Sequence, residues 1–296
     1  MHQEKRNTTR HISLAFFLNL GFTIIEIIGG IYTNSIAILS DALHDFGDTV
    51  SLAVAWYLQK ISNRGRDRYY TYGYRRFSLL GAVFISVMLI VGSVFIIKES
   101  ISRLTTPNEV NAQGMMYLAI LGIIVNGIAV LRLRKGTSMN ERAVYIHMLE
   151  DVLGWVAVLV VSIVMMFVDA PILDPMLSIG ITLWVLYNVY KNLRKTFRIL
   201  LQEVPQNVDI DSVENELNDI QGISSIHDLH IWSLDGENNI ITLHAVIDDN
   251  SSDEKQRKLK RAIRDTCERL NIQHATIEFE TKGEECVFED DSGVIG

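Results

Sequence analysis

Residues 40–48 read Ser-Asp-Ala-Leu-His-Asp-Phe-Gly-Asp, and within this stretch His44 and Asp48 lie four residues apart. Later in the chain, residues 147–151 read His-Met-Leu-Glu-Asp, so His147 and Asp151 repeat the same spacing. Side chains at i and i+4 share one face of a helix, so two such helices side by side would present two imidazoles and two carboxylates to one point. The two pairs predict a tetrahedral site for a divalent metal ion.

Long apolar runs surround both pairs and fill the chain as far as about residue 200. A bilayer core needs about 20 consecutive, mainly apolar residues per helix. An ionisable residue at that depth is costly unless it is paired, so it marks a functional site. The sequence therefore predicts an α-helical membrane protein with six transmembrane helices, at roughly 12–32, 36–59, 77–98, 114–133, 146–168 and 172–192.

After Pro205 the sequence becomes polar and its hydrophobic period changes. The pattern predicts a helix, two strands, a second helix and a third strand, at 208–220, 225–234, 240–247, 253–270 and 276–280. This α-β-β-α-β order is that of a ferredoxin-like α+β domain without one strand. We expect a six-helix transmembrane domain at 1–204, a cytoplasmic domain at 205–283 and an acidic, disordered tail at 284–296.

Basic residues are concentrated in alternate connections between the predicted spans, and this distribution sets the orientation of a membrane protein. Lysine and arginine crowd 5–10, 60–76, 132–142 and 191–198, whereas 32–35 and 169–171 contain none. We expect the basic segments and both termini to face the cytoplasm.

The second predicted span has a strongly polar face. Because each helical residue turns by about 100°, four ionisable residues share about a third of the helix circumference: Asp41, His44, Asp45 and Asp48. Asp41 and Asp45 have two open roles, either to hold the metal ligands in place or to form a route by which a cation reaches them. Polar residues of other spans are expected to be interhelical hydrogen-bond partners or to support the metal ligands: Glu26, Asn126 and Asp174.

The chain resembles the cation diffusion facilitator family, in particular its bacterial cobalt-zinc-cadmium efflux and zinc-transporter branch. The resemblance rests on residues 40–48, 72–76 (Tyr-Gly-Tyr-Arg-Arg), 147–151, 174–175 (Asp-Pro) and 227–234 (His-Asp-Leu-His-Ile-Trp-Ser-Leu). It implies a homodimer in the bacterial inner membrane that exchanges cytoplasmic divalent metal for protons. The transport site that it implies consists of His44, Asp48, His147 and Asp151.

The resemblance also gives the cytoplasmic domain a role in dimerisation and regulatory metal binding, with His227, His244 and Glu280 as ligands. Strand alternation groups Glu278 with Glu280 but leaves His227 an outlier at the start of its strand. It also places His230 on the side opposite its apolar neighbours. The predicted cytoplasmic ligands are therefore His227, His230, His244, Glu278 and Glu280.

Two further details follow from the resemblance. Some relatives bind another metal through an aspartate and two histidines between the second and third spans. Here Asp67 is kept, but Tyr70 and Tyr74 stand where the histidines would be, so we expect this loop site to be absent. The resemblance also predicts an ion pair between Arg76 and Asp209.

Two imidazoles with two carboxylates suit Zn²⁺ first, with Co²⁺ and Cd²⁺ as competitors. Imidazole binds a metal only in its neutral form, so protons compete with metal for the same ligands. An Fe²⁺ or Mn²⁺ exporter of the same family and a membrane metal sensor without transport stay open as alternatives. Four complete ligands and the lack of a His-Glu-x-x-His motif argue against an enzyme, so Zn²⁺ is expected as substrate and regulatory ligand rather than as a catalytic cofactor.

Overall fold

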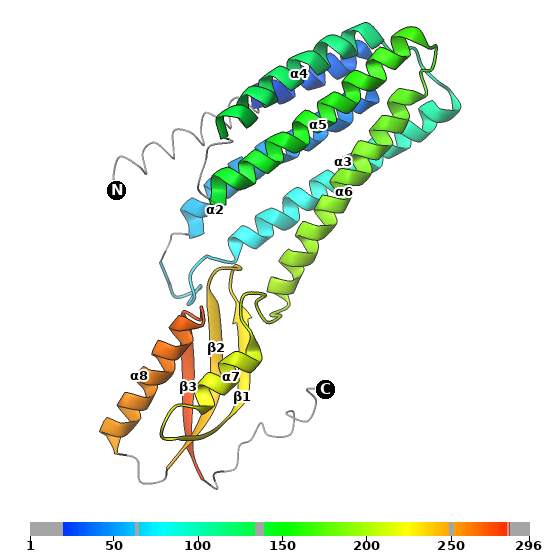
Figure 1. The fold of residues 1–296 in the computed structure, drawn as a ribbon. Helices are drawn as coiled ribbons and strands as arrows, with labels where there is room; N and C mark the ends of the chain where they lie inside the picture. The colour runs from blue at the N-terminus through cyan, green and yellow to red at the C-terminus, as the bar shows by residue number, and fades with distance from the viewer. Residues whose placement is uncertain (1–19, 63–64, 134–138, 249–251, 283, 285–296) are drawn as a thin grey trace. The chain divides into compact units, whose positions relative to one another are not determined.

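The structure is a computed structural model that describes residues 20–62, 65–133, 139–248, 252–282 and 284 (Figure 1). For residues 139–147 it describes the backbone only. The chain forms two compact units. One contains the described residues up to Lys60 and those from Gly81 to Leu193, and the other contains Ile61–Leu80 and the residues from Arg194 onward.

The described part of the chain contains six long helices before residue 201. They are Leu20–Thr33, α2 (Ile36–Ser62), α3 (Phe77–Thr105), α4 (Ala112–Leu133), α5 (Met139–Phe167) and α6 (Leu173–Leu200). Every predicted span corresponds to one of them, although residues 12–19 of the first lie outside the described residues. By length and hydropathy alone, α3 and residues Met148–Phe167 of α5 could cross a membrane. The aspartates of the polar face lower the hydropathy of α2.

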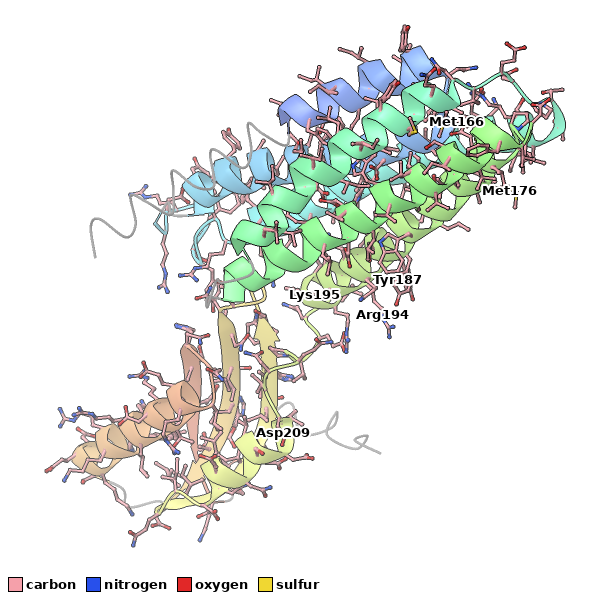
Figure 2. The ribbon with its side chains drawn as sticks, turned by 45° about the horizontal axis from the view of Figure 1, so that its top comes forward. Met166, Met176, Tyr187, Arg194, Lys195 and Asp209 are labelled. Atoms are coloured by element: carbon pink, nitrogen blue, oxygen red, sulfur yellow. The ribbon has the colours of Figure 1, made fainter. Side chains whose placement is uncertain are left out.

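The outer surface of these helices is apolar. Phe95 of α3 is 67% exposed, and Met166 and Met176 are about half exposed where α5 ends and α6 begins (Figure 2). At the other end of α6, the basic residues Arg194 and Lys195 follow one another. Large exposed apolar side chains on helices that end in basic residues are typical of a surface that faces lipid.

Two groups of buried apolar residues hold the helical unit together. One joins the helix Leu20–Thr33, the beginning of α2, α4 and α5, and includes Phe22, Ile38, Met115 and Trp155. The other joins α2, α3 and α6 through Leu43, Leu89 and Val185, among others. α2 takes part in both groups, so its polar face is held within the helical unit.

The beginning of α2 is fixed by a buried carboxylate from α6. The preceding helix ends at Thr33, and the next residue, Asn34, has a φ of 56°, in the left-handed region that asparagine tolerates. Asp174 then accepts hydrogen bonds from the Ser35 hydroxyl at 2.5 Å and from the backbone N–H groups of Ile36 and Ala37 at 2.8 and 3.2 Å. These bonds satisfy donors that the first turn of a helix leaves without partners.

The second unit contains an α+β domain with the predicted order of elements. These are α7 (Ile210–Asn218), β1 (Ile223–Ser233), β2 (Asn239–Ile247), α8 (Asp253–Arg269) and β3 (His274–Thr281). The sheet order is β1-β2-β3, with β1 antiparallel and β3 parallel to β2. The parallel pair follows from the α8 crossover between β2 and β3.

Both helices of this domain pack on one face of the sheet. α7 buries Val213 and Leu217, and α8 buries Ile263 and Cys267, in each case one turn apart. They share a core with alternate residues of the strands: Ile231, Ile241, Leu243, Ala245, Ile277 and Phe279. The intervening strand residues therefore lie on the opposite face, which we call the open face.

Candidate functional site

The pair on α2 has the geometry expected from its spacing. Nε2 of His44 lies 3.6 Å from Oδ2 of Asp48, and the two side chains are 19% and 30% exposed. Because one turn separates them on the same helix face, a single ion can contact both.

The carboxylate expected from α5 faces the same region. Asp151 is 6% exposed and is an electrostatic neighbour of Asp41 and Asp45 on α2. One turn beyond it, α5 approaches α2 at Gly154, where a methyl group would lie 3.6 Å from Oδ1 of Asp41. The structure thus brings three predicted acidic residues together, while the side chain of His147 lies outside the described residues.

The supporting polar residues differ in their surroundings. Asp45 is 3% exposed, and Asn126 of α4 is 6% exposed with no partner for its Nδ2 atom in the described part of the chain. Asp174 caps α2, and because His44 comes eight positions after Ile36, the cap lies about 12 Å along the helix from His44. Its hydrogen bonds give Asp174 a structural role at the start of α2.

A second cluster lies on the open face of the cytoplasmic sheet. His227 stands opposite His244 in the β1–β2 register, and His244 stands opposite Glu278 in the β2–β3 register. Nε2 of His227 lies 3.0 Å from Oε2 of Glu280, and Nδ1 of His244 lies 2.6 Å from Oε1 of Glu280. Ligand atoms of His227, His244 and Glu280 all lie within 4.8 Å of one another, and among the described side chains no other three histidine, cysteine or acidic residues are grouped in this way.

A β-bulge places both histidines of β1 on the open face. His230 comes three positions after His227, so regular alternation would put the two on opposite faces. The register shifts between them, and Asp228 has a φ of 45°, in the left-handed region. The apparent outlier in the sequence pattern is therefore explained by one extra residue in the strand.

Asp228 is a member of this cluster that the sequence pattern did not reveal. Its carboxylate oxygens lie 2.9 Å from Nε2 of His230 and 3.4 Å from Nε2 of His244. Glu278 lies 3.6 Å from the same nitrogen of His244. His244 thus directs one ring nitrogen to Glu280 and the other to Asp228 and Glu278, a carboxylate–histidine arrangement that commonly orients metal ligands. The unusual φ, which no motif signals, brings Asp228 into place.

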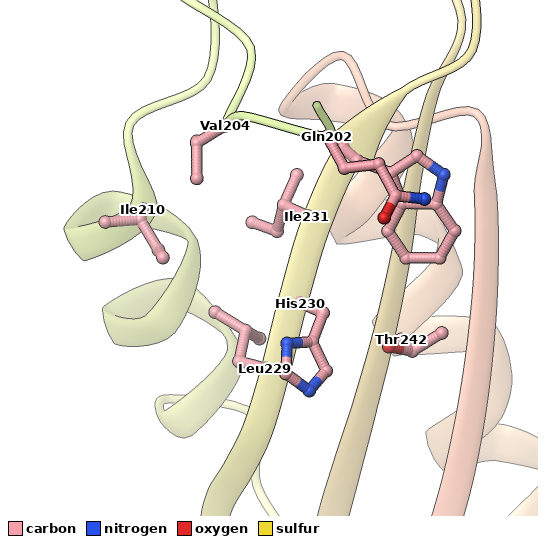
Figure 3. Close-up of a pocket in the computed structure, with 8 residues that line it drawn as sticks. Gln202, Val204, Ile210, Leu229, His230, Ile231 and Thr242 are labelled. Carbon is pink, nitrogen blue, oxygen red and sulfur yellow. The ribbon is translucent and has the colours of Figure 1, made fainter. Parts of the chain in front are cut away.

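A pocket of about 460 Å³ adjoins β1 in the same unit (Figure 3). It is lined by Gln202, Val204, Ile210, Leu229, His230, Ile231, Trp232 and Thr242. Of the histidines and carboxylates clustered on the open face, only His230 reaches the wall of this pocket. The pocket is therefore distinct from the space between His227, His244 and Glu280.

In the connection between α2 and α3, Asp67 stabilises the conformation of the loop through hydrogen bonds. Asp67 accepts hydrogen bonds from the Tyr74 hydroxyl at 2.5 Å and from the N–H groups of Tyr70 and Tyr69 at 2.7 and 2.8 Å. The Tyr74 bond contributes most to holding the pKa of Asp67 below its usual range, and the two backbone bonds add to it. The tyrosine that replaces a histidine of the loop motif thus binds the remaining carboxylate.

The same connection contacts the cytoplasmic sheet of its unit. The ion pair here joins Arg75 to Asp235 at 3.7 Å. Asp209, the expected partner of Arg76 and labelled in Figure 2, accepts a hydrogen bond from Ser212. The predicted pairing of Arg76 with Asp209 is therefore wrong. The turn after β1, rather than the start of α7, supplies the acidic partner.

A helical domain with an apolar outer surface, followed by a small α+β domain, is the architecture of a membrane protein that carries a folded domain outside the lipid. A family model described as "Cation efflux transmembrane domain" matches residues 12–201, and one described as "Cation efflux protein, cytoplasmic domain" matches residues 205–282. The chain belongs to the cation efflux family.

Relatives of this family resemble nearly the whole chain. A cadmium, cobalt and zinc/H(+)-K(+) antiporter of Bacillus subtilis (strain 168) is 34% identical over 285 residues, covering 95% of this chain and 91% of the relative. The metal cation efflux system protein CzcD of Cupriavidus metallidurans is 35% identical, covering 94% and 89%. The zinc transporter ZitB of Escherichia coli (strain K12) is 30% identical, covering 94% and 90%.

Proposed function

We propose that this protein is a divalent metal cation efflux transporter that exchanges cytoplasmic Zn²⁺ for protons. The transport site consists of His44 and Asp48 on α2 with His147 and Asp151 on α5. The observation that supports it best is the acidic face of α2, whose His44 and Asp48 side chains lie one turn apart while Asp151 of α5 faces Asp41 and Asp45.

The donor set supports zinc as the preferred substrate. Two imidazoles and two carboxylates fit tetrahedral Zn²⁺, and Cd²⁺ and Co²⁺ accept similar ligands. The names of the relatives include all three metals. Fe²⁺ or Mn²⁺ export by the same site is the alternative substrate assignment.

The exchange follows from competition for the ligands. Imidazole must be neutral to bind metal, and metal binding therefore releases protons. The empty, deprotonated site loads metal from the cytoplasm, and movement of the helices then opens it to the outside, where protons displace the metal. The antiporter name of the Bacillus relative supports proton exchange.

The protein lies in the inner membrane of a bacterium, with both termini and the basic connections on the cytoplasmic side. It acts as a homodimer, and its cytoplasmic domain contributes to the dimer contact. Metal held by His227, His244 and Glu280 acts as a regulatory ligand there. The distances of 2.6 and 3.0 Å that bring both histidines to Glu280 support this second site.

The test is zinc uptake into sealed inside-out vesicles with an imposed pH gradient. Asp151→Asn removes a proposed ligand with little change of shape, and Glu150→Gln, an exposed neighbour on α5, is its matched control. We expect gradient-driven uptake by the wild type and by Glu150→Gln, and none by Asp151→Asn. Equal uptake by all three would contradict the site. Zinc binding without uptake in any of them would favour the sensor.

A further inference from the structure

The connection between α2 and α3 consists mostly of arginine and aromatic residues. Residues 66–77, which we call the basic-aromatic loop, read Arg-Asp-Arg-Tyr-Tyr-Thr-Tyr-Gly-Tyr-Arg-Arg-Phe. The whole loop belongs to the same compact unit as the cytoplasmic sheet. Because α3 begins at Phe77 and is long and apolar enough to cross a membrane, the loop lies at a surface of the bilayer.

The basic-aromatic loop has a defined conformation, which its own residues stabilise. Asp67 accepts hydrogen bonds from the Tyr74 hydroxyl and from two backbone N–H groups of the loop. The N–H group of Gly73, whose φ is 80°, donates to the carbonyl oxygen of Tyr70 at 2.9 Å. The rings of Tyr70, Tyr74 and Phe77 pack with centroids between 4.4 and 5.4 Å apart. The acidic residue of the loop is therefore engaged within the fold of the loop.

Most of the positive charge of the loop is not balanced by the protein. Arg66, Arg68 and Arg76 are exposed, and among the described residues none of the three forms an ion pair. Arg75 differs from them because it pairs with Asp235 at 3.7 Å. Exposed positive charge without a carboxylate partner attracts an anion from the surroundings.

The exposed aromatic side chains indicate which anion fits. The general bias of basic residues toward the cytoplasmic side accounts for the arginines, but not for Tyr69, which is 89% exposed. Its backbone N–H group, rather than its ring, takes part in the fold of the loop. Tyrosine is enriched at the level of the lipid headgroups, where its ring meets apolar groups and its hydroxyl meets water. A guanidinium group binds phosphate oxygens through paired N–H groups. An anionic phospholipid offers both partners, whereas a free anion offers only one.

We propose that Arg66, Arg68 and Tyr69 bind the headgroup of an anionic phospholipid in the adjoining leaflet. The two guanidinium groups bind the negatively charged headgroup, and the Tyr69 ring lies at the boundary between headgroups and acyl chains. The same loop packs on the cytoplasmic sheet, where the ring centroids of Tyr72 and His274 lie 5.8 Å apart. A lipid bound here therefore stabilises the loop against which the sheet packs. This inference goes beyond the proposed function and does not depend on zinc transport.

The test is lipid binding to the full-length protein in detergent, measured by native mass spectrometry with phosphatidylglycerol and with phosphatidylcholine. Arg66→Gln combined with Arg68→Gln removes two charges, while the hydrogen bonds of Asp67 are kept. An arginine near a membrane surface strengthens the binding of anionic lipid by about fivefold, so the preference for phosphatidylglycerol should fall by about 25-fold. Tyr69→Ala should weaken the binding of both lipids severalfold, because it removes an interfacial aromatic ring.

The matched control is Arg261→Gln combined with Arg264→Gln, which removes the same charge from exposed positions of α8. This control should keep the preference of the wild type for phosphatidylglycerol. An equal fall in both double variants would overturn the proposal, since net charge alone would then attract the lipid. A wild type without a preference would also overturn it. Displacement of phosphatidylglycerol by millimolar inorganic phosphate would show that the arginines bind a free anion instead. Unchanged binding in Tyr69→Ala would remove Tyr69 from the site.

A measurement on the wild type covers the case in which the variants do not fold. Phenylglyoxal modifies exposed arginine side chains, and the modified positions are identified by mass spectrometry of peptides. Phosphatidylglycerol should slow the modification of Arg66 and Arg68 and leave that of Arg261 unchanged, whereas phosphatidylcholine should protect none of them. Equal modification of Arg66 and Arg68 in the two lipids would overturn the proposal. Because these measurements contain no zinc, their outcome is separate from that of the transport assay.

Discussion

Nδ1 of His244 lies 2.6 Å from Oε1 of Glu280, and this contact joins β2 to β3 on the open face of the sheet. Glu280 also reaches His227 on β1, so one carboxylate links all three strands. A ligand set supplied by three strands of one sheet is rigid, because the ladder hydrogen bonds fix the spacing of the ligands.

The first prediction is that His244→Ala weakens zinc binding at the cytoplasmic site by more than about 100-fold, because loss of a ligand costs more than loss of a supporting partner. Binding is measured by calorimetry on full-length protein with Asp48→Asn and Asp151→Asn, which remove both carboxylates of the proposed transport site. Asp228→Asn should weaken binding by only about tenfold to a hundredfold, since it acts through His244.

His274→Ala is the matched control for that experiment. His274 lies on β3 of the same sheet, and its ring packs against Tyr72 at 5.8 Å rather than against the cluster. Zinc affinity should be the same in this variant as in its parent. An equal loss in His244→Ala and His274→Ala would mean that general disturbance of the sheet, and not removal of a ligand, weakens binding.

The second prediction concerns the cap of α2. Asp174→Ala removes the acceptor for three donors and should lower the free energy of unfolding by about 2 kcal/mol. Thermal unfolding in detergent measures the change. Asp169→Ala, an exposed residue just before α6, should have little effect. The zinc affinity of the folded Asp174→Ala protein should be unchanged. A loss of zinc affinity without a loss of stability would indicate that Asp174 supports the proposed metal ligands.

Much of the fold could be predicted because the decisive signals are local. Apolar runs of membrane length placed the six helices, and alternation placed β1 and β2 within two residues of their observed bounds. The end of α6 was not predicted. The predicted span ended at residue 192, whereas the helix continues to Leu200, because lysine and arginine beyond the apolar run have a high helix propensity.

The cytoplasmic cluster could be predicted only in part. The grouping of Glu278 with Glu280 follows from regular alternation, and His244 was expected from the family resemblance. The bulge at Asp228 depends on one backbone angle that neighbouring residues do not signal. The partner of Arg75 also depends on tertiary packing, since Asp235 lies far away in sequence. Glu26 was predicted to be an interhelical hydrogen-bond partner or a support for the metal ligands, and its lack of a donor among the described residues depends on tertiary packing.

The third prediction concerns the contact between α4 and α5. A Cβ atom at Gly122 would lie 2.3 Å from the ring of Trp155, which is completely buried. Gly122→Ala should therefore destabilise the helical unit by about 1–3 kcal/mol, as overpacking does. Gly127→Ala, on the same helix, meets nothing within 4 Å and should be neutral or slightly stabilising in thermal unfolding. Equal stability of the two variants would contradict the close approach of α4 to Trp155.

The last prediction concerns the reactivity of Cys267, which α8 buries in the core of the cytoplasmic domain. Burial raises the pKa of the Cys267 thiol to about 11. Maleimide reacts with the thiolate, so in a Cys286→Ser background the folded protein should react at neutral pH about 100-fold more slowly than an exposed thiol. Unfolding in denaturant should restore the ordinary rate.

The pH dependence of this reaction follows from the same shift. In the unfolded chain the thiol ionises at about pH 8.5, so the rate should level off just above that pH. In the folded protein the thiol stays protonated, and the rate should keep rising toward about pH 11. Between about pH 8.5 and pH 11, the Cys267 thiol binds its proton more strongly in the folded protein than in the unfolded chain. The free energy of unfolding should therefore fall as the pH rises through this range. A folded-state rate that levels off near pH 8.5 would show that Cys267 is accessible to water.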